Sequence, residues 1–320
     1  MKTIAVLTSG GDAPGMNAAI RAVVRAGISM GLNVKGIRRG YAGLIEGDII
    51  DMDARSVSDI IHRGGTMLYT ARCPEFKTQE GVDKAIASCK AHGIDGIVVI
   101  GGDGSFRGAR DLSLGGSPCI GVPGTIDNDI SSTEYTIGYD TAINTALEMA
   151  DKLRDTAQSH DRCSVVEVMG RRAGYLALQT GIACGAIAIL VPEVEFDLNK
   201  DVIEKIKAVH KTGKKHFVVV VAEGVGGVTR IAEEIEEATG IESRATILGH
   251  VQRGGVPTAR DRVMASQMGY RAVELLSQGI GNRVITFVDN QLGDKDIYEA
   301  LAMTKKFDIE EYNMATAISI

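Results

Sequence analysis

Short apolar runs alternate with longer amphipathic stretches along this chain. Six runs of four to six residues are almost uniformly apolar and rich in branched side chains, and glycine or polar residues follow them. This pattern is typical of strands that are buried on both faces of a parallel sheet. The predicted strands are Ile4–Leu7, Gly96–Ile100, Cys119–Val122, Val165–Met169, Ala186–Val191 and Phe217–Ala222.

Helical spacing of apolar residues is present between these runs. A stripe of apolar side chains at intervals of three and four residues forms one face of a helix. Strands that alternate with helices predict βαβ units, with helices on both faces of a sheet. The two clearest stripes are Ala19, Ile20, Val23, Val24 and Ile28, and Ile143, Ala146, Leu147, Ala150 and Leu153.

Composition supports a large α/β protein. The 320 residues fit two domains or one large α/β unit. The chain is 44% hydrophobic and 24% charged, and its 39 glycines against 6 prolines indicate many tight turns. Aromatic residues are only 4%, so the core is expected to be aliphatic. A domain boundary is expected near Gly138, where a long helix is predicted to begin.

Charge and cysteine content narrow the class of protein. A formal net charge of −6 argues against a general binder of nucleic acid or of anionic membranes. The 5 cysteines form no C-x-x-C pair, which indicates reduced thiols. The start of the chain is too polar for a signal peptide, and the longest apolar stretch, around Gly181 to Val191, is shorter than the roughly 20 residues of a spanning helix. We expect a soluble, cytoplasmic protein.

Ligands of open α/β sheets bind beyond the carboxyl ends of the strands, so the residues after each apolar run are the informative ones. The first run is followed by "TSGGDAPGMNAAIR", in which Gly10, Gly11 and Gly15 would let the backbone approach a ligand. A helix that starts near Asn17 would offer its N–H groups to an anion. The spacing matches neither the Walker A pattern nor G-x-G-x-x-G, so these glycines could instead only form a tight turn.

The second informative loop is "GGDGSFRGAR". Gly102 and Gly104 flank the single acid Asp103, and Ser105 lies at the predicted start of a helix. Backbone amides would bind phosphate oxygens, and the carboxylate would bind Mg²⁺, a hard cation that prefers oxygen ligands. Alternatively, Asp103 is only a loop or helix-cap acid.

The third loop, "GVPGTIDNDI", places Asp127 and Asp129 two residues apart. An ordinary polar turn would tolerate both acids. If the stretch is extended, both side chains face the same way and could hold a cation and accept a proton. Their mutual repulsion would then be relieved by the cation and by nearby arginines.

Basic residues follow the later strands. Arg171 and Arg172 in "MGRRAGYLAL" are predicted at the start of a helix, where cations oppose the helix dipole and a bound anion would offset that cost. They could also be solvated arginines. The remaining candidates at the later strand ends are Glu223 in "EGVGG" and Arg244, His250 and Arg253 in "RATILGHVQRGG". Carboxylates for Mg²⁺, amides for phosphate and arginines for a second phosphate together suit phosphoryl transfer.

Five motifs in the same order resemble the bacterial-type ATP-dependent 6-phosphofructokinases. They are "TSGGDAPGMNAAIR", "GGDGS", "PGTIDND", "MGRRAG" and "GHVQRGG", and they span nearly the whole chain. The resemblance implies a cytoplasmic homotetramer that catalyses the committed step of glycolysis. In that step, which depends on Mg²⁺, the γ-phosphoryl group of ATP is transferred to the 1-hydroxyl of fructose 6-phosphate.

The resemblance also implies a fold. It predicts two Rossmann-like three-layer α/β/α domains with mainly parallel sheets and the active site in the cleft between them. The nucleotide domain would comprise residues 1–138 with about 251–300. The sugar-phosphate domain would comprise residues 139–250 with about 301–320.

Site residues carried over by the resemblance fall into three groups. The nucleotide would be surrounded by Gly11, Arg72, Cys73, Gly102, Asp103, Gly104, Ser105 and Gly108, with Asp103 and Asp129 near Mg²⁺. Catalysis would use Asp127 as general base, with Gly11, Thr125, Asp129 and Arg171 around the transferred group. The sugar phosphate would be held by Thr125, Asp127, Asp129, Met169, Gly170, Arg171, Glu223, His250 and Arg253, with Arg162 and Arg244 reaching it from a neighbouring subunit.

Two glycines bear on the phosphoryl donor. Pyrophosphate-using relatives usually carry an acid at the position of Gly104 and a lysine at that of Gly124. Both are glycine here, which favours ATP. A pyrophosphate-dependent phosphofructokinase and a non-catalytic sugar-phosphate binding module are the alternatives. A dinucleotide dehydrogenase would need a proper G-x-G-x-x-G followed by an acid, and we find no convincing one.

An effector site for ADP or phosphoenolpyruvate is also implied. Its matching residues are Arg21, Arg25, Arg55, Asp59, Arg154, Gly185 and Lys214. Two positions depart from the family: Ile187 replaces a common metal-holding acid, and Thr212 a common basic residue. We therefore expect weak or phosphate-only regulation. Without the resemblance, Arg21 and Arg25 would only mark a solvated helix face.

Overall fold

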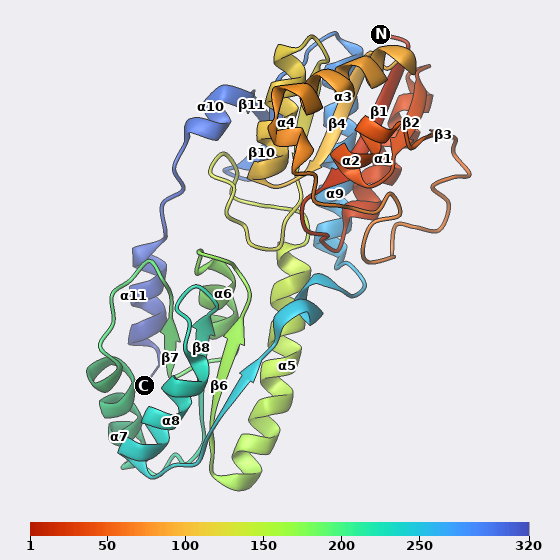
Figure 1. The fold of residues 1–320 in the computed structure, drawn as a ribbon. Helices are drawn as coiled ribbons and strands as arrows, with labels where there is room; N and C mark the ends of the chain where they lie inside the picture. Colours follow the sequence, from red (N-terminus) through yellow and green to blue (C-terminus); the bar gives the residue numbers. More distant parts are fainter. Residues whose placement is uncertain (320) are drawn as a thin grey trace. The chain divides into compact units, whose positions relative to one another are not determined.

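The computed structural model describes residues 1–319, and the chain forms two compact units (Figure 1). We call them the first and the second unit and describe each by itself. The first unit comprises Met1–Ile126, Ile130–Thr141 and Arg253–Lys305. The second comprises Asp127–Asp129, Ala142–Gln252 and the segment from Lys306 onward.

The first unit is built on a seven-stranded mixed sheet with the strand order β11-β10-β5-β4-β1-β2-β3. Its five central strands are mutually parallel, and β3 and β11 run antiparallel at the two edges. The strands are β1 (Thr3–Ser9), β2 (Asn33–Ile37), β3 (Ile49–Met52), β4 (Gly96–Gly101), β5 (Cys119–Pro123), β10 (Arg283–Val288) and β11 (Gln291–Asp296).

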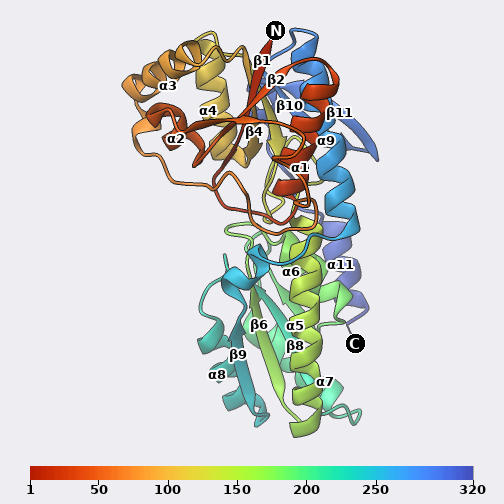
Figure 2. The ribbon, with the colours of Figure 1, turned by 90° about the vertical axis from the view of Figure 1, so that its right-hand side faces the viewer.

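Helices cover both faces of this sheet. In Figure 2, α2, α3 and α4 lie on one side of the strands and α1 and α9 on the other. The central strands are therefore sealed from water, and Leu7, Val99 and Ile100 are 0% exposed. The helices of this unit are α1 (Met16–Ser29), α2 (Gly40–Glu46), η1 (Glu75–Lys77), α3 (Gln79–Ala91), α4 (Asp103–Leu114), α9 (Ala259–Ser277) and α10 (Ile297–Ala302).

The second unit has a four-stranded, fully parallel sheet with the order β7-β8-β6-β9. Val202, Ile206 and Ile235 pack with the strand residues Val165 and Val219 in one aliphatic core. The strands are β6 (Cys163–Val168), β7 (Ala188–Leu190), β8 (Phe217–Ala222) and β9 (Ser243–Ile247). The helices are α6 (Tyr175–Ala183), η2 (Leu198–Ile203), α7 (Glu204–His210), α8 (Val228–Thr239), η3 (Gly249–Arg253) and α11 (Ile309–Ala317), while α5 (Tyr139–His160) begins in the first unit and continues here.

The predicted α/β class with two three-layer units and mainly parallel sheets is confirmed. All six predicted strands are present, and five further strands were missed. Of these, β11 reads QLGDKD and lies at a sheet edge, where polar residues are tolerated. The apolar stripe of α1 is also confirmed except at Ile28, which is 39% exposed.

Two further expectations concern cysteines and membranes. All 5 cysteines are free thiols, four of them buried and Cys73 half-buried. Burial raises the pKa of the Cys184 thiol to about 11, so it is protonated at neutral pH. Across residues 1–319, no helix has the length and apolarity that a membrane crossing requires.

Candidate active site

Three candidate loops of the first unit leave the sheet side by side. Strands β1, β4 and β5 are neighbours, with Ser9 paired to Gly101 and Gly101 paired to Pro123. The residues that follow these three strand ends therefore emerge together at the carboxyl edge of the sheet. This is the edge at which open α/β sheets bind ligands.

The loop after β4 turns directly into α4. Gly102 is the N-cap residue and Asp103 lies in the first turn, where a carboxylate is favourable for the helix dipole. Ser105 Oγ donates to the carbonyl of Ser9 at 3.0 Å, which ties this helix start to the neighbouring strand end. The first turn of α4 therefore presents an acid and the backbone of a helix start in a fixed position.

The two donor-related glycines differ in their surroundings. A Cβ on Gly104 would meet no neighbouring group within 4 Å. A Cβ on Gly124 would lie 3.0 Å from Ile100 Cγ2 and 3.3 Å from Met16 Cε. Packing therefore explains glycine at position 124, whereas nothing in the protein requires it at position 104, inside a helix where glycine costs roughly 0.5–1 kcal/mol.

Gly11 lies against Arg253. A Cβ on Gly11 would collide with the guanidinium of Arg253, and Arg253 Nη1 donates to the carbonyl of Asp12 at 3.2 Å. The first loop thus positions this arginine through a glycine that leaves room for it. Gly108, by contrast, packs on the stacked rings of Tyr41 and Phe76 inside the unit.

The stretch 121–130 is a strand end followed by a turn. Thr125 is buried, and its carbonyl accepts a hydrogen bond from Thr136 Oγ1 at 2.6 Å. Asn128 has a φ of 50°, in the left-handed region. The extended conformation on which a shared direction of Asp127 and Asp129 depended is therefore absent, because the backbone turns between them.

Asp127, assigned to the second unit, is fully buried and pairs with an arginine. Its Oδ2 lies 3.1 Å from Nε of Arg171, whose side chain is 60% exposed. The backbone N–H of Arg171 donates to the carboxylate of Glu223, and Arg171 has a φ of 55°. Three predicted site residues thus meet in one cluster: the buried Asp127, the arginine Arg171 that can reach solvent, and Glu223, which accepts from the backbone of that arginine.

The expected helix start at Arg171 and Arg172 is wrong. Helix α6 begins at Tyr175, with Gly174 as its N-cap residue, and both arginines lie in the preceding turn. Gly170 has a φ of 141°, which only glycine adopts readily. This turn directs the chain so that Arg171 contacts Asp127. Because the two arginines lie outside α6, they do not oppose its dipole, and the dipole gives no argument for a bound anion here.

Strand register brings the later candidates of this unit to one edge. Val168 pairs with Ala222 across β6 and β8, and Glu167 pairs with Ile247 across β6 and β9. Met169, Glu223 and the turn that carries His250 therefore follow three adjacent strand ends, and His250 is exposed. The second unit repeats the arrangement of the first.

Asp129 is half-buried near Tyr175. Burial, then the negative charges of Glu193 and Asp129, raises the pKa of the Tyr175 phenol to about 12. Within residues 1–319, no three Asp, Glu, His or Cys side chains gather as a metal-binding group. Asp103 and Asp129, the expected metal ligands, belong to different units.

The two arginines expected to cross to a neighbouring subunit share one carboxylate. Glu242 lies 2.8 Å from Arg162 Nε and 2.6 Å from Arg244 Nη2. Hydrogen bonds from Arg162 and then from Arg244 lower the pKa of Glu242. The side chain of Arg244 remains 70% exposed, so it is available to an outside group.

Comparison with known proteins decides the family. The family described as "Phosphofructokinase" matches residues 3–276. The "ATP-dependent 6-phosphofructokinase" of Clostridium botulinum (strain Loch Maree / Type A3) is 59% identical over 319 residues, covering 100% of both chains. The chain belongs to the phosphofructokinase family.

Solved phosphofructokinases share this fold. The phosphofructokinase from Saccharomyces cerevisiae has a TM-score of 0.89 and 35% identity over 100% of this chain, which spans 48% of the yeast chain. A pyrophosphate-dependent phosphofructokinase from Marinobacter aquaeolei has a TM-score of 0.85 and 25% identity, covering 97% of this chain and 86% of that chain.

One functional candidate of this phosphofructokinase was missed in the sequence. Gln252 is 0% exposed, and its Oε1 accepts from the backbone N–H of Met169 at 2.8 Å. It thereby fixes the segment Met169–Arg171. The residue lies inside the motif "GHVQRGG", so attention to the uncharged member of that motif could have found it.

The residues matched to the phosphofructokinase effector site are divided between the units. In the second unit, Arg154 lies near Cys184, which precedes Gly185, and Lys214 lies over the ring of Phe217 at 5.8 Å. Ile187 is 2% exposed and packs in the aliphatic core. Arg21, Arg25, Arg55 and Asp59 belong to the first unit, as do Arg72 and Cys73 of the expected nucleotide set.

Proposed function

We propose that this protein is an ATP-dependent 6-phosphofructokinase that transfers the γ-phosphoryl group of ATP to the 1-hydroxyl of fructose 6-phosphate. The observation that carries the proposal is the Asp127–Arg171 pair, a buried acid 3.1 Å from an exposed arginine, in a chain 59% identical to an enzyme of that name. The oxygen of the 1-hydroxyl forms a bond to the γ-phosphorus, the bond from that phosphorus to the bridging oxygen breaks, and ADP and fructose 1,6-bisphosphate leave.

Asp127 takes the proton of the attacking hydroxyl. A general base must lie within hydrogen-bond reach of that proton. Arg171 keeps the carboxylate of Asp127 oriented and offers its exposed guanidinium to the transferred phosphoryl group. Together with Thr125 and the N–H of Gly11, it stabilises the charge on that group. Catalysis is then mostly positioning and charge stabilisation.

The first unit binds the nucleotide. Three parallel strand ends present Gly11, the Gly102–Ser105 turn and Thr125 at one edge. Helix α4 starts at Asp103, so its first N–H groups face the phosphates. Gly104 leaves the space for the nucleotide that a side chain would fill. Arg72, Cys73 and Gly108 complete the set implied by the family.

The donor set fits Mg²⁺. This cation prefers oxygen ligands and is usually held by one or two carboxylates, phosphate oxygens and water, so a group of three protein ligands is not required. Asp103 and Asp129 would hold it. When bound, Mg²⁺ neutralises charge on the phosphate oxygens.

The second unit, together with Arg253, binds the sugar phosphate. Met169, Gly170, Glu223 and His250 follow adjacent strand ends. Arg162 and Arg244, both on Glu242, would contact the 6-phosphate of a neighbouring subunit's substrate in a cytoplasmic homotetramer. Such charge-assisted bonds to phosphate are the strong ones.

The test is turnover of fructose 6-phosphate with Mg²⁺ and either ATP or pyrophosphate, measured side by side. The proposal predicts fructose 1,6-bisphosphate with ATP and none with pyrophosphate. Turnover with pyrophosphate alone would be consistent with the fold and with Asp127 as the base, but it would overturn ATP as the phosphoryl donor. Binding of fructose 6-phosphate without turnover would favour a non-catalytic binding module.

Effector control is proposed to be weak. Ile187 is buried in the aliphatic core and offers no oxygen to a metal, and Thr212 Oγ1 donates to the carbonyl of Val209. ADP or phosphoenolpyruvate would thus be held through phosphate contacts with arginines and Lys214 alone. Titration of initial rates with ADP tests this, and strong activation of fructose 6-phosphate affinity would contradict it.

A further inference from the structure

A fully buried carboxylate that the proposed mechanism does not use lies in the first turn of α9. Asp261 is 0% exposed and receives four hydrogen bonds. Its Oδ1 accepts from Tyr135 Oη at 2.6 Å and from the N–H of Gly138 at 2.7 Å. Its Oδ2 accepts from the N–H of Thr141 at 2.8 Å and from Thr141 Oγ1 at 2.5 Å. All five groups belong to the first unit.

This carboxylate joins the starts of two helices. Gly138 directly precedes α5 and Thr141 is the third residue of that helix, while Asp261 lies in the first turn of α9, so one negative charge serves both N-termini. Thr258, the N-cap residue of α9, reinforces the junction. Its N–H donates to Thr141 Oγ1 at 3.0 Å, and its Oγ1 donates to Asp140 Oδ2 at 2.6 Å.

The segment 135–141, which contains the three residues that donate to Asp261, also contacts two of the loops that we assign to the reacting phosphoryl group. Thr136 Oγ1 donates to the carbonyl of Thr125 at 2.6 Å, and the N–H of Ile137 donates to the carbonyl of Pro123 at 2.9 Å. A Cβ on Gly15 would lie 2.7 Å from Ile137 Cγ2 and 3.5 Å from Asp261 Cβ. Asp261 therefore lies directly behind the Thr125 loop and the end of the first glycine loop.

We propose that Asp261 is a positioning residue for phosphoryl transfer, which sets the backbone of Thr125 and of the Gly11–Gly15 loop through the segment 135–141. This inference rests on the roles proposed above for Thr125 and Gly11. A carboxylate suits the task because it only accepts hydrogen bonds, and all four partners donate. Each oxygen faces one backbone N–H, which cannot rotate away.

The isosteric variant Asp261→Asn is therefore disruptive in either orientation of its amide. One flip directs NH₂ at the N–H of Gly138, and the other directs it at the N–H of Thr141. The segment must shift to separate the two donors, and the loop of Thr125 shifts with it. A misplacement of about 1 Å at a reacting group costs on the order of 100-fold in rate.

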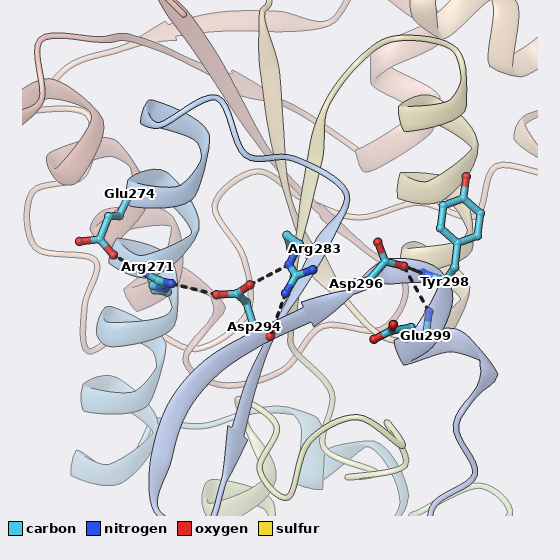
Figure 3. A network of polar contacts seen from close by, with 7 residues as sticks. All are labelled: Arg271, Glu274, Arg283, Asp294, Asp296, Tyr298 and Glu299. Atoms are coloured by element: carbon cyan, nitrogen blue, oxygen red, sulfur yellow. Dashed lines mark hydrogen bonds and ion pairs between the residues drawn. The ribbon is translucent and has the colours of Figure 1, made fainter.

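A matched control exists in the same unit. Asp294 on β11 accepts hydrogen bonds from Arg271 Nη2 of α9 at 2.9 Å and from Arg283 Nε of β10 at 2.7 Å (Figure 3). It also ties α9 to the sheet and is 13% exposed, but it lies in the edge hairpin β10–β11, and these two arginine partners lie outside the loops named above. Asp294→Asn should lower stability without changing the rate.

The experiment measures kcat and both KM values at 20 °C for wild type, Asp261→Asn and Asp294→Asn, with circular dichroism and thermal melting of each. We expect kcat of Asp261→Asn to fall about 10–100-fold, with both KM values within about threefold, while Asp294→Asn keeps kcat within about twofold. Equal kcat for folded Asp261→Asn and wild type would overturn the inference. An inactive wild type would instead overturn the proposed function.

A second pair decides the case if Asp261→Asn does not fold. Thr141→Ser keeps the hydroxyl that donates to Asp261 and accepts from Thr258, whereas Thr141→Val removes it at nearly constant volume. We expect kcat to stay within about twofold for Thr141→Ser and to fall about 3–10-fold for Thr141→Val. An unchanged kcat in Thr141→Val would show that the junction is structural only, and so would overturn the inference.

Discussion

The first and second units each present candidate ligand groups at the corresponding edge of their own sheet, but the chemistry of these groups differs. Both carry candidate residues at the carboxyl edge of a parallel sheet. The first unit presents backbone groups of glycine loops with one acid, Asp103. The second presents charged side chains held by each other, namely Asp127 with Arg171 and Arg162 with Arg244 through Glu242.

This difference separates two tasks that one fold can perform. Backbone N–H groups at a helix start are rigid and suit a polyphosphate that must be placed. Side chains can take up a proton or reach a phosphate across a gap, as the proton acceptor and the sugar-phosphate ligands must. The units thus share a parallel-sheet arrangement and differ in whether backbone or side-chain atoms lie at its carboxyl edge. The following predictions test this difference.

The largest effect is expected in the second unit, at Asp127. Asp127→Asn keeps the shape but removes the base, so kcat should fall about 10²–10⁴-fold while MgATP affinity stays within about threefold. Steady-state kinetics and nucleotide titration measure both. Asp161→Asn is the control, since that exposed acid forms a surface pair with Lys215 at 3.6 Å. A near-normal rate in Asp127→Asn would remove it from the role of base.

The next effect is expected in the first unit, at Gly104. A Cβ there meets no group within 4 Å beyond its chain neighbours and its own helix backbone, so Gly104→Asp should fold normally. The added carboxylate would occupy and repel the nucleotide, so KM for ATP should rise at least about 10-fold, the equivalent of 1.4 kcal/mol. Leu114→Asp, an exposed position of the same helix, controls for added charge. An unchanged KM for ATP would mean that the space beside Gly104 is not the nucleotide site.

Arg253 is an exception to this difference between the units, because it is a charged candidate side chain that belongs to the first unit. Loss of a charge-assisted hydrogen bond costs roughly 1.5–3 kcal/mol, so Arg253→Ala should raise KM for fructose 6-phosphate about 10–100-fold. Initial rates at varied sugar phosphate measure this. Arg230→Ala, an 82% exposed arginine paired with Glu234, is the control. If KM is unchanged, Arg253 serves only to pack against Gly11.

The smallest effect is expected at Glu242. Glu242→Gln loosens Arg162 and Arg244 without removing them, so KM for fructose 6-phosphate should rise only about two- to fivefold, with kcat constant. The lowered pKa of Glu242 means that the pairing is present above the ordinary glutamate value and is lost only as pH falls through the lowered value. The effect should therefore be the same at pH 8 and at pH 6. A large fall in kcat would indicate that this pair acts on the chemistry.

The sequence predicted this fold where single segments decide it. Uniform apolar runs such as Phe217–Ala222 became strands with the predicted limits. Strand β11 was missed because its pairing with β10 depends on a hairpin rather than on apolarity. The start of α6 was misplaced by four residues, because Gly170 and Arg171 adopt positive φ in a turn that composition does not reveal.

Site residues were predicted as types and positions, but not as partners. Asp127 and Arg171 were both named, yet their mutual contact follows from the turn after β6. The contacts of Met169 with Gln252 and of Arg162 with Glu242 join residues that lie far apart in the chain, so the sequence alone did not reveal them. Gly104 and Gly124 look alike in sequence, and only the packing distances show that neighbouring side chains crowd position 124 but not position 104.

The most direct test of this division of tasks is calorimetric titration of MgATP into Asp127→Asn and Gly104→Asp. The account predicts wild-type affinity for Asp127→Asn, which has lost its turnover, and at least about 10-fold weaker binding for Gly104→Asp. The reverse result, with nucleotide affinity lost in Asp127→Asn and kept in Gly104→Asp, would contradict it.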